Sequence, residues 1–469
     1  MADTRSEPPY AERARRQLTP EACEFRFALD RFDAALLDDV QEVLLSPGLA
    51  PGDPAVAGLV QAARERGIPI IGEIELFARA LVRLGDERAY APKVLAITGT
   101  NGKTTVTSLT TWMLRSAGMR ARAAGNIGPA ALHALCEAID QADLPDVWVL
   151  ELSSFQLETT HQLAPHAAAV LNISEDHLDW HGSLDAYAAA KARIFARAGI
   201  AVVNRNDPRV ADMVEDLAGQ RVRTFGVDLP EFEGDLGLDG GQGLLWLAEA
   251  APVDLDEPTA PRRRKNAPEP GRNSGRLNRL MPADALQIRG LHNALNAQAA
   301  LLLARSLDVP WAPLLRALRE YRGEPHRVAW VRTVSEVDYI DDSKGTNVGA
   351  TVAALQGLGR RVVLIAGGLG KGQDFSVLAP VVAQHARAVV LLGQDAGRIK
   401  EALARTGVPC VRVASLPEAV REAARQARPG DVVLLSPACA SQDMFRDYRH
   451  RAEAFVEAVE ELALERGEV

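Results

Sequence analysis

The sequence is poor in cysteine, has no long apolar run and carries no excess of positive charge. Its four cysteines are widely spaced and form no Cys-x-x-Cys pair, which argues against a disulfide framework or a thiolate zinc site and suits a reducing cytosol. The net charge of −9 argues against general nucleic-acid binding, which needs a basic surface. No apolar run approaches transmembrane length, and the polar residues 1–16 do not have the pattern of a secretory signal. These absences predict a cytoplasmic protein that neither binds nucleic acid nor inserts into a membrane.

What is present is an ordinary globular composition in a long chain. Hydrophobic residues make up 47% of the 469 residues and charged residues 25%, so several cores can be buried. The length predicts a protein of several domains.

The strongest local signal is a Gly-rich turn between an apolar strand and a helical pattern. Residues 94–97 are apolar, and the turn that follows reads Gly99-Thr100-Asn101-Gly102-Lys103-Thr104-Thr105. Backbone N–H groups in such a turn, together with the helix N-terminus, form an anion site. Lys103 is placed to reach terminal phosphates, and the Thr104 hydroxyl to hold Mg²⁺. Ile97 stands where the generic pattern has its first Gly, so this is a shortened variant. A Gly-rich turn without a ligand is the alternative that these residues disfavour.

Residues 1–92 are predicted to form a small α/β unit. Strands are expected at 40–45 and 68–71, and helices at 55–66 and 73–84. This alternation predicts a parallel sheet with crossover helices. The cluster Asp3-Thr4-Arg5 stands at the very start and would, by itself, be a frayed terminus.

Polar residues follow buried strands in the second unit, residues 93–323. Glu151 ends the predicted strand 146–152, where a carboxylate near a phosphate loop is a natural Mg²⁺ ligand. His177 follows the strand 168–173, at the edge where open α/β sheets bind ligands. A surface acid and a structural histidine are the respective alternatives. For Lys191, on the predicted helix 183–197, the residues alone favour a solvated side chain. His181 is expected to face solvent or cap a helix.

The stretch 226–285 changes character and is predicted to be an insertion. Its Gly-rich part, 234–243, suggests a hairpin with 244–247 as the second strand. The basic run at 262–265 could suggest nucleic acid or an anionic lipid surface, but a solvated surface segment in an acidic chain is favoured. In the helix predicted at 290–307, Asn293 and Asn296 share one face; they could read adenine edges or only start the helix.

From about residue 324 a third alternating unit begins. Its predicted strands, 337–340, 361–366, 388–392, 408–413 and 432–435, are separated by helices, and the last helix follows Ser441. The pattern indicates a doubly wound sheet without a dinucleotide fingerprint. Three polar loops, at 341–347, 367–371 and 436–441, would share one carboxyl edge of this sheet. A shared edge makes them a candidate site.

These motifs resemble those of the Mur ligases, the ATP-dependent amide-bond formers of peptidoglycan synthesis. The resemblance begins with the Gly99–Thr105 loop and spans nearly the whole chain. The Ser436–Ser441 stretch is most similar to the members that add D-glutamate, and the Asn-Pro-containing Arg loop of the members that add a diamino acid is not found. The other matching stretches are Gly125–Gly128, Glu151–Leu157, Ser174–Asp179, Lys191, His292–Asn296, His326-Arg327 and Asp342–Asn347.

The resemblance implies a three-domain α/β fold. Residues 1–92 would be an incomplete N-terminal Rossmann-like domain that binds the UDP substrate. Residues 93–323 would be a central P-loop ATPase-like domain with the insertion at 226–285. Residues 324–469 would be a C-terminal doubly wound Rossmann-like domain that binds the amino acid.

The resemblance also implies a role for each matching position. Lys103, His177, Lys191 and Lys344 would be catalytic, and two Mg²⁺ ions would be held by Thr104, Glu151, His177 and a Lys191 carbamylated by CO₂. ATP would contact Gly99, Thr100, Asn101, Gly102, Lys103, Thr104, Thr105, Asn296, Arg327 and Asp342. The other substrates would contact Asp3, Thr4, Arg5 and Ser46 at the UDP end, Asn126 at the muramoyl part, and Thr346, Lys371, Ser441 and Tyr448 with Lys344 around the amino acid.

The implied reaction is ATP-dependent ligation of D-glutamate to UDP-N-acetylmuramoyl-L-alanine through an acyl phosphate, by a cytoplasmic monomer. Two alternatives remain open. One is another ligase of this type, such as a folylpolyglutamate synthase. The other is an inactive nucleotide-binding paralogue that acts as a regulatory module.

Two departures from the family pattern stand out. Leu369 replaces an acid that many relatives carry, so no acidic role is assigned there. The strand, Gly loop and helix that open the family's first domain are not found before Asp3. We therefore expect the native protein to begin about 30–40 residues upstream of Met1, the length of that part of a βαβ unit.

Overall fold

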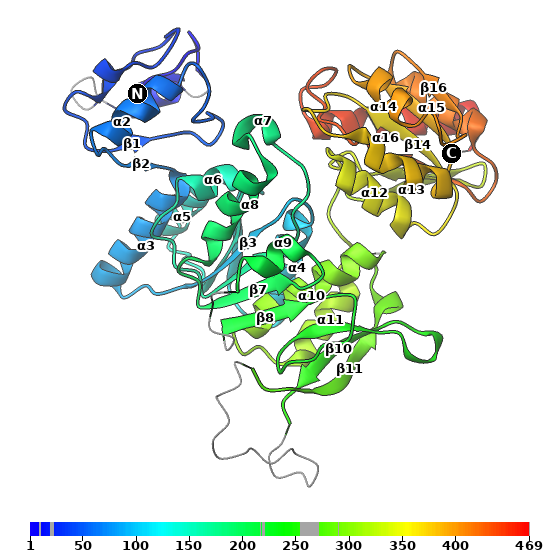
Figure 1. The fold of residues 1–469 in the computed structure, drawn as a ribbon, viewed down its shortest axis with the longest axis horizontal. Helices are drawn as coiled ribbons and strands as arrows, with labels where there is room; N and C mark the ends of the chain where they lie inside the picture. The colour runs from blue at the N-terminus through cyan, green and yellow to red at the C-terminus, as the bar shows by residue number, and fades with distance from the viewer. Residues whose placement is uncertain are drawn as a thin grey trace.

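In the computed structural model the chain forms three lobes in sequence order (Figure 1). The structure describes residues 1–8, 11–18, 23–215, 217, 221–253, 272–288 and 290–468. The α/β class and the three-part architecture expected from the sequence are confirmed. Within the described ranges, no helix combines the length and apolar character needed to cross a bilayer.

The first lobe is small and its sheet is short. β1 (Val43–Leu44) pairs in parallel with β2 (Ile70–Ile71), and α2 (Ala57–Glu65) connects them. The predicted strands 40–45 and 68–71 are therefore correctly located but too long. Pro47 and Pro69 flank the paired residues and have no N–H with which to extend the ladder. The remaining elements of this lobe are α1 (Ala11–Gln17) and a 3-10 turn, η1 (Ala34–Leu37).

The first five residues are tied to the rest of this lobe. Ala2 forms a parallel bridge with Arg26, and the Asp3 N–H donates to the Arg26 carbonyl at 3.0 Å. The Ala28 N–H donates to the Arg5 carbonyl, also at 3.0 Å. A frayed terminus, the alternative for this cluster, is thus not what the structure has.

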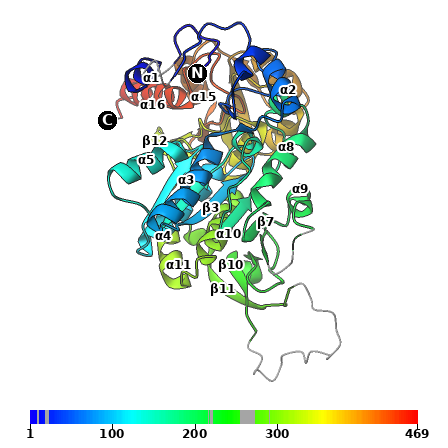
Figure 2. The same ribbon diagram turned by 90° about the vertical axis from the view of Figure 1, so that its left-hand side faces the viewer.

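Helix α3 (Glu73–Arg88) joins the first lobe to the second and packs against the second (Figure 2). Phe77 is fully buried, and its ring meets the edge of Trp148 with centroids 5.4 Å apart. The helix ends at Arg88, beyond the predicted end at residue 84. It lies before the predicted boundary at residue 92, yet its apolar face as far as Leu84 is covered by the core of the central lobe.

The central lobe is a six-stranded parallel sheet covered by helices on both faces. Leu95 and Ile97 of β3 belong to the core on one face, and Val94 and Ala96 to the core on the other. Burial on both faces explains why these strands are nearly all apolar. The sheet order is β4-β5-β3-β6-β7-β8, formed by β3 (Lys93–Thr98), β4 (Ala121–Gly125), β5 (Val147–Glu151), β6 (Ala167–Val170), β7 (Ile200–Asn204) and β8 (Val222–Phe225).

The helices of the central lobe differ from the predicted ones mainly in length. The predicted helix 183–197 is split into α8 (Leu184–Ala192) and a 3-10 turn, η2 (Arg193–Phe195). The strand predicted at 168–173 ends at Val170, so the residues after it form a loop. The other helices are α4 (Lys103–Ser116), α5 (Ala131–Asp140), α6 (Ser154–Glu158), α7 (Leu178–His181), α9 (Pro208–Asp212), α10 (Leu291–Arg305) and α11 (Trp311–Glu320).

The stretch 226–285 contains a three-stranded antiparallel sheet. β9 (Leu236–Asp239) and β10 (Trp246–Ala251) form the predicted hairpin, with its second strand two residues later than expected. β11 (Arg276–Pro282) adds a third strand that the sequence did not reveal, because its first four residues are exposed and three of them are polar. The short 3-10 turns η4 (Gly241–Gly243) and η5 (Ala283–Ala285) belong to this region. The basic run 262–265 lies outside the described residues.

The third lobe is a six-stranded sheet in the order β12-β13-β17-β14-β15-β16. All neighbours are parallel except β12 (Ala329–Val334), an antiparallel edge strand that the sequence analysis missed. The predicted strands are found as β13 (Val337–Asp341), β14 (Val362–Gly367), β15 (Ala386–Leu392), β16 (Cys410–Arg412) and β17 (Val432–Leu435). The helices are α12 (Val348–Gly357), α13 (Leu378–His385) preceded by the 3-10 turn η6 (Phe375–Val377), α14 (Ala396–Ala402), α15 (Leu416–Gln426) and α16 (Tyr448–Glu465). The three polar loops follow β13, β14 and β17, which are neighbours, so they do share one carboxyl edge.

The packing of α3 gives a test of the lobe boundary. Phe77→Ala should destabilise the central lobe by about 3–5 kcal/mol, because it removes a buried ring and leaves a cavity. Val82→Ala is the matched control, since Val82 lies on the same helix and is 60% exposed. Hydrogen exchange should become faster in β3 and β5 but not in β14 and β17. Faster exchange confined to β1 and β2 would assign α3 to the first lobe instead.

Candidate active site

The phosphate loop lies between β3 and α4 in a conformation that requires glycine. Gly99 has φ 150° and Gly102 has φ 84°, values that side chains disfavour. A Cβ on Gly102 would also lie 2.4 Å from Asn296 Oδ1. Lys103 Nζ donates to the carbonyl oxygens of Gly99 and Thr100, both at 2.8 Å. The lysine therefore folds over its own loop, where a phosphate can compete for it.

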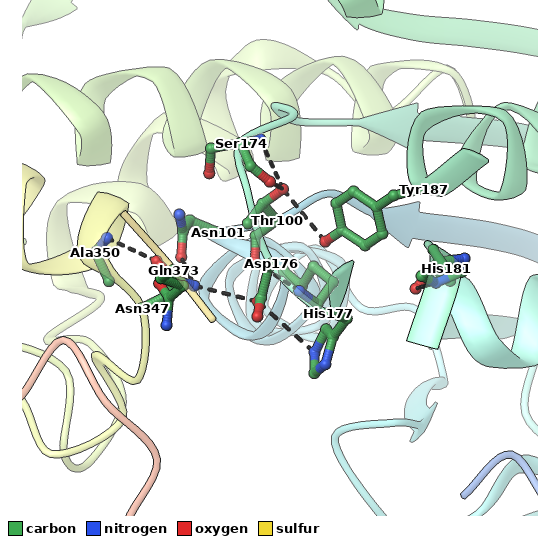
Figure 3. Close-up of polar contacts among 12 residues, drawn as sticks. Thr100, Asn101, Ser174, Asp176, His177, His181, Tyr187, Asn347, Ala350 and Gln373 are labelled. Carbon is green, nitrogen blue, oxygen red and sulfur yellow. Dashed lines mark hydrogen bonds and ion pairs between the residues drawn. The ribbon is translucent and has the colours of Figure 1, made fainter. Parts of the chain in front are cut away.

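The loop after β6 holds the phosphate loop in place (Figure 3). Thr100 Oγ1 accepts from the Ser174 N–H at 3.0 Å and from the Tyr187 hydroxyl at 3.3 Å. The Asn101 N–H donates to Asn172 Oδ1 at 2.8 Å. Sequence reasoning missed Asn172 and Tyr187 as site residues. Position directly after a buried strand is the signal that could have found Asn172.

Glu151, at the end of β5, is a buried carboxylate with spare acceptor capacity. Its side chain is 2% exposed, and Oε1 accepts from Asn126 Nδ2 at 2.6 Å. Oε2 is buried without any hydrogen-bond partner. A buried carboxylate oxygen left unpaired is costly, and a hard cation is the partner it suits. The alternative of an exposed loop acid is therefore wrong. In the described part of the chain, no group of three or more His, Cys, Asp and Glu side chains forms a complete metal site.

Lys191 is buried beside the same loop, so the solvated side chain favoured by the residues alone is wrong. It is 1% exposed, and Nζ donates to the Gly99 carbonyl at 3.0 Å and to Thr98 Oγ1 at 3.3 Å. Nζ also lies 4.5 Å from the centre of the Tyr187 ring. Burial, reinforced by the charge of Lys103, holds the pKa of Lys191 well below its ordinary value. A neutral amine at this position is a nucleophile.

His177 stands at the start of α7 with a left-handed backbone, φ 54°. Its Nε2 is 3.6 Å from Asp176 Oδ2 (Figure 3). Its ring meets the Phe155 ring edge-on, with centroids 4.7 Å apart. Burial lowers the pKa of His177, although Asp176 opposes the shift. The imidazole is thus kept neutral, the form that binds a metal.

His181, expected to face solvent or to cap a helix, is half-buried among other side chains. Its Nε2 is 2.9 Å from Ser154 Oγ, and its ring stacks on Phe155 with centroids 5.6 Å apart. Burial lowers the pKa of His181 to about 4. The rings of His177, His181, Trp180 and Phe155 form one cluster, which the sequence did not predict because α7 is only one turn long.

The third lobe reaches the phosphate loop directly. Arg327 Nη2 and Lys344 Nζ both donate to Thr104 Oγ1, at 3.0 and 2.9 Å. Asn347 Nδ2 donates to Asn101 Oδ1 at 3.0 Å and to Asp176 Oδ2 at 3.4 Å (Figure 3). Burial lowers the pKa of Lys344 to about 8. Asn347, another residue missed as a site residue, also caps α12 by accepting from the Ala350 N–H.

A cavity beside this junction is lined by residues of α10 and of the third lobe. Asn296 Nδ2 donates to Asn293 Oδ1 at 3.1 Å, so both readings of this pair, ligand contact and helix start, remain compatible with the geometry. Asp342 lies at the far wall, where Ser436 Oγ donates to it at 2.7 Å and burial raises its pKa to about 7. The polar lining comprises Asn101, Thr105, Asn172, Asn204, His292, Asn293, Asn296, Glu324, Arg327 and Asp342.

The remaining loops of the third lobe meet on the other side of Lys344. Lys344 Nζ lies 5.4 Å from the Tyr448 ring centre. A bridge between Leu369 and Ala440 brings the 367–371 loop, with Lys371, beside the 436–441 loop, with Ser441. Gln373, which sequence reasoning missed, is buried between the Val348 N–H and the Gly370 carbonyl. Thr346 belongs to the same 341–347 loop as Lys344.

The candidate residues of the first lobe are not part of this cluster. Asp3 accepts from the backbone and side chain of Arg5 at 2.8–2.9 Å, and hydrogen bonding to Arg5 lowers the pKa of Asp3 to about 2. Thr4 lies between them in the sequence, and Ser46 follows β1. The first lobe stands apart from the third (Figure 1).

Comparison with known proteins identifies two matching regions and full-length relatives. The family profile "Mur ligase middle domain" matches residues 97–237, and "Mur ligase, glutamate ligase domain" matches residues 326–439. The UDP-N-acetylmuramoylalanine–D-glutamate ligase of Bordetella parapertussis is 61% identical over 470 residues, which covers 100% of this chain and 92% of that protein. The enzyme of the same name from Cupriavidus pinatubonensis is 58% identical over 472 residues, covering 100% and 93%.

Solved structures share the fold at lower identity. A MurF ligase from Thermotoga maritima in complex with ADP has a TM-score of 0.58 at 16% identity, over 91% of this chain and 99% of that one. The UDP-N-acetylmuramate-alanine ligase from the same organism has a TM-score of 0.56 at 20% identity, over 98% and 93%. At these identities the likeness shows the fold alone.

The burial of Asp342 predicts a pH-dependent cost. Its pKa is raised to about 7, so the unfolded chain loses the proton first and stability falls as pH rises from about 4 to 7. Asp342→Asn lacks this loss. The free energy of unfolding of the third lobe, measured by urea unfolding without ligands, should therefore rise in the variant relative to the parent by about 2–3 kcal/mol between pH 5 and pH 8.

Asp338→Asn, on the strand β13 that leads to Asp342, is the matched control. Although burial alone would raise the pKa of Asp338, hydrogen bonds from Thr333 and Arg360 lower it, so its stabilising effect is lost only in stronger acid. Its variant should show the same deficit at pH 5 and pH 8. If the free energy of unfolding of Asp342→Asn also differs from that of the parent by the same amount at pH 5 and pH 8, ionisation of Asp342 does not destabilise the folded protein.

Proposed function

Because the chain belongs to the Mur ligase family, we propose that it joins D-glutamate to UDP-N-acetylmuramoyl-L-alanine at the expense of ATP, which becomes ADP and phosphate. The reaction is a step of peptidoglycan synthesis. Relatives named for this activity are 56–61% identical over the whole chain, and nothing favours a folylpolyglutamate synthase or an inactive paralogue. We further propose that the protein works in the cytoplasm as a monomer.

One observation carries the assignment of the reacting centre. Thr104, in the phosphate loop, is contacted by Arg327 and Lys344 from the third lobe. A transferring phosphate bound at this loop would therefore meet cations from both lobes. Such preorganised charge stabilises phosphoryl transfer.

The reaction follows from charge. The substrate carboxylate attacks the γ-phosphate of ATP and releases ADP, which leaves an acyl phosphate; the amine of D-glutamate then attacks the acyl carbon, and phosphate leaves. Two anions must meet in the first step. In our proposal Lys103 and Lys344 offset their repulsion, and closure of the third lobe keeps water from the acyl phosphate.

The residues fit a divalent cation. Glu151 Oε2 is buried without a partner, and the Thr104 hydroxyl and the neutral His177 are further ligands of suitable type. We propose that these three groups and a carbamate on Lys191 hold two Mg²⁺ ions. When bound, the metal ions would neutralise charge on the phosphates.

Carbamylation of Lys191 is supported by its burial and lowered pKa. An ammonium group would repel a metal ion, whereas an uncharged amine can add CO₂ and lose a proton. The product is a carboxylate-like group. It would convert a residue that opposes the metal site into one that completes it.

The remaining sites are proposed by position. Asn296 and Asp342 would hold adenine and ribose beside Gly99–Thr105, and Arg327, on the cavity wall and on Thr104, would lie between ribose and phosphates. Asn126 would contact the muramoyl part, and the D-glutamate site would comprise Lys344, Thr346, Lys371, Ser441 and Tyr448. Asp3, Thr4, Arg5 and Ser46 would meet the UDP end. The domains would be 1–92, 93–323 and 324–469, although α3 packs with the second.

The direct test is phosphate release from ATP. The protein should release phosphate only when UDP-N-acetylmuramoyl-L-alanine and D-glutamate are both present. Omitting either substrate, or replacing D-glutamate by L-glutamate, should reduce release to background. Release that depends on another acceptor or amino acid would contradict the assignment.

Lys103→Met should lower the rate of phosphate release by about a hundredfold or more, as loss of one transition-state contact does. Among the residues that the structure describes, its Nζ donates hydrogen bonds to carbonyls of its own loop alone, so the thermal melting temperature should stay within a few degrees of the parent's. Lys93→Met, at the exposed start of β3, the strand that leads into the phosphate loop, is the control and should retain full activity. Near-normal turnover in Lys103→Met would remove this residue from the mechanism.

Lys191 should carry a carbamate in the active protein. With ¹³C-bicarbonate, carbon NMR should show a carbamate signal that is absent in Lys191→Ala and retained in Lys400→Ala, a change on exposed α14. Lys191→Ala should lose nearly all activity and regain part of it with short carboxylates. Retention of most activity without rescue would refute the ligand role.

A further inference from the structure

The third lobe contains a buried arginine to which the proposed mechanism gives no role. Arg451 lies one turn into α16 and is 2% exposed. Burial lowers its pKa to about 10. In the part of the chain that the structure describes, no carboxylate lies within ion-pair distance of it. A buried cation of this kind is retained only where its hydrogen bonds are valuable.

In the described part of the chain, the three hydrogen bonds that the Arg451 side chain donates all go to the two loops that flank the proposed D-glutamate site. Nε donates to Ser343 Oγ at 3.0 Å, and Nη2 donates to the Ser343 carbonyl at 2.8 Å. Nη1 donates to the Cys439 carbonyl at 3.1 Å. The planar guanidinium thus bridges the loop after β13 and the loop after β17, a task that its rigid fork suits.

The atoms that Arg451 holds lie next to the functional side chains. The Ser343 carbonyl belongs to the peptide bond that leads into Lys344, and the Cys439 carbonyl lies two residues before Ser441. Ser343 Oγ in turn donates to the Tyr448 carbonyl at 2.7 Å. One side chain therefore fixes the backbone at Lys344, near Ser441 and, through Ser343, at Tyr448.

We infer that Arg451 is a positioning residue that sets the spacing of the D-glutamate site by joining its two loops. This inference rests on the proposed function for the identity of the amino acid. Arg451 itself touches no substrate. Loss of its fork would let the 341–347 and 436–441 loops move apart. This weakens D-glutamate binding more than ATP binding, because ATP would contact this region through Asp342 and otherwise mainly through the phosphate loop and α10, which belong to another lobe.

Arg451→Lys and Arg451→Met test this in the full-length protein. Lysine keeps the charge but cannot join both loops, whereas methionine also removes the charge. The KM for D-glutamate should rise about tenfold or more in Arg451→Met and by less in Arg451→Lys. The KM values for ATP and for the UDP-sugar should change less than about twofold.

Arg387→Met is the matched control. Arg387 pairs with Asp431 at the opposite, amino edge of the same sheet, so its loss destabilises the lobe without touching either loop. It should lower the melting temperature and leave the KM for D-glutamate unchanged. An equal rise in this KM in Arg387→Met would mean that Arg451 only stabilises the lobe, and would overturn the inference.

A second measurement does not depend on activity. Amide hydrogen exchange in residues 342–347 and 437–441 should be faster in Arg451→Lys than in the parent, and unchanged in the β14 strand. Unaltered exchange in both loops would overturn the inference even if Arg451→Met fails to fold. If the parent shows no D-glutamate-dependent phosphate release, the proposed function fails, whatever the exchange result shows about the loops.

Discussion

The structure depends on the burial of more positive than negative charge around one loop. Lys103 and Lys344 are half-buried beside the phosphate loop with Arg327, and Lys191 is fully buried there as a neutral amine; burial lowers the pKa of each lysine. Glu151 and Asp176 are the acids whose charges oppose these shifts. Buried cations that are not fully paired with anions destabilise the fold, so the site has an excess of positive charge. The negative charge of bound phosphate groups would neutralise this excess, so the arrangement that destabilises the free protein would favour phosphate binding.

The same charges explain why the lobes meet where they do. Arg327 and Lys344 come from the third lobe, and both need an acceptor when no phosphate is present. They find it in the Thr104 hydroxyl, while Asn347 bonds to Asn101 and Asp176. Because these contacts use polar groups that a bound nucleotide would also use in our proposal, closure of the third lobe and nucleotide binding would share one set of atoms. Arg451 does not contact the phosphate loop; it joins the 341–347 and 436–441 loops, which carry the polar groups of the proposed D-glutamate site.

The fold followed from the sequence wherever a strand is buried on both faces. β3, β5, β14 and β17 are continuous apolar runs, and each was located to within a residue or two. The missed strands, β4, β8, β11 and β12, all lie at sheet edges, where a strand is less completely buried than in the middle of the sheet. The predicted strand lengths were wrong where a proline or a loop ends the pairing of two strands, as in β1 and β2. The packing of α3 on the central lobe could not be read from its sequence position, because an amphipathic helix shows which face is apolar but not what covers it.

The sequence by itself determined the chemistry of the phosphate loop, its place between strand and helix, and the family to which the chain belongs, because these depend on residues adjacent in the chain. The tertiary structure decided which polar groups meet. Lys191 reads as a solvated lysine on an Ala-rich helix until the fold buries it against Gly99, and His181 reads as a surface residue until Phe155 covers it. The contact of Lys344 with Thr104 joins residues 240 positions apart. Burial and long-range contact fix the protonation of these groups, and neither is a property of local sequence.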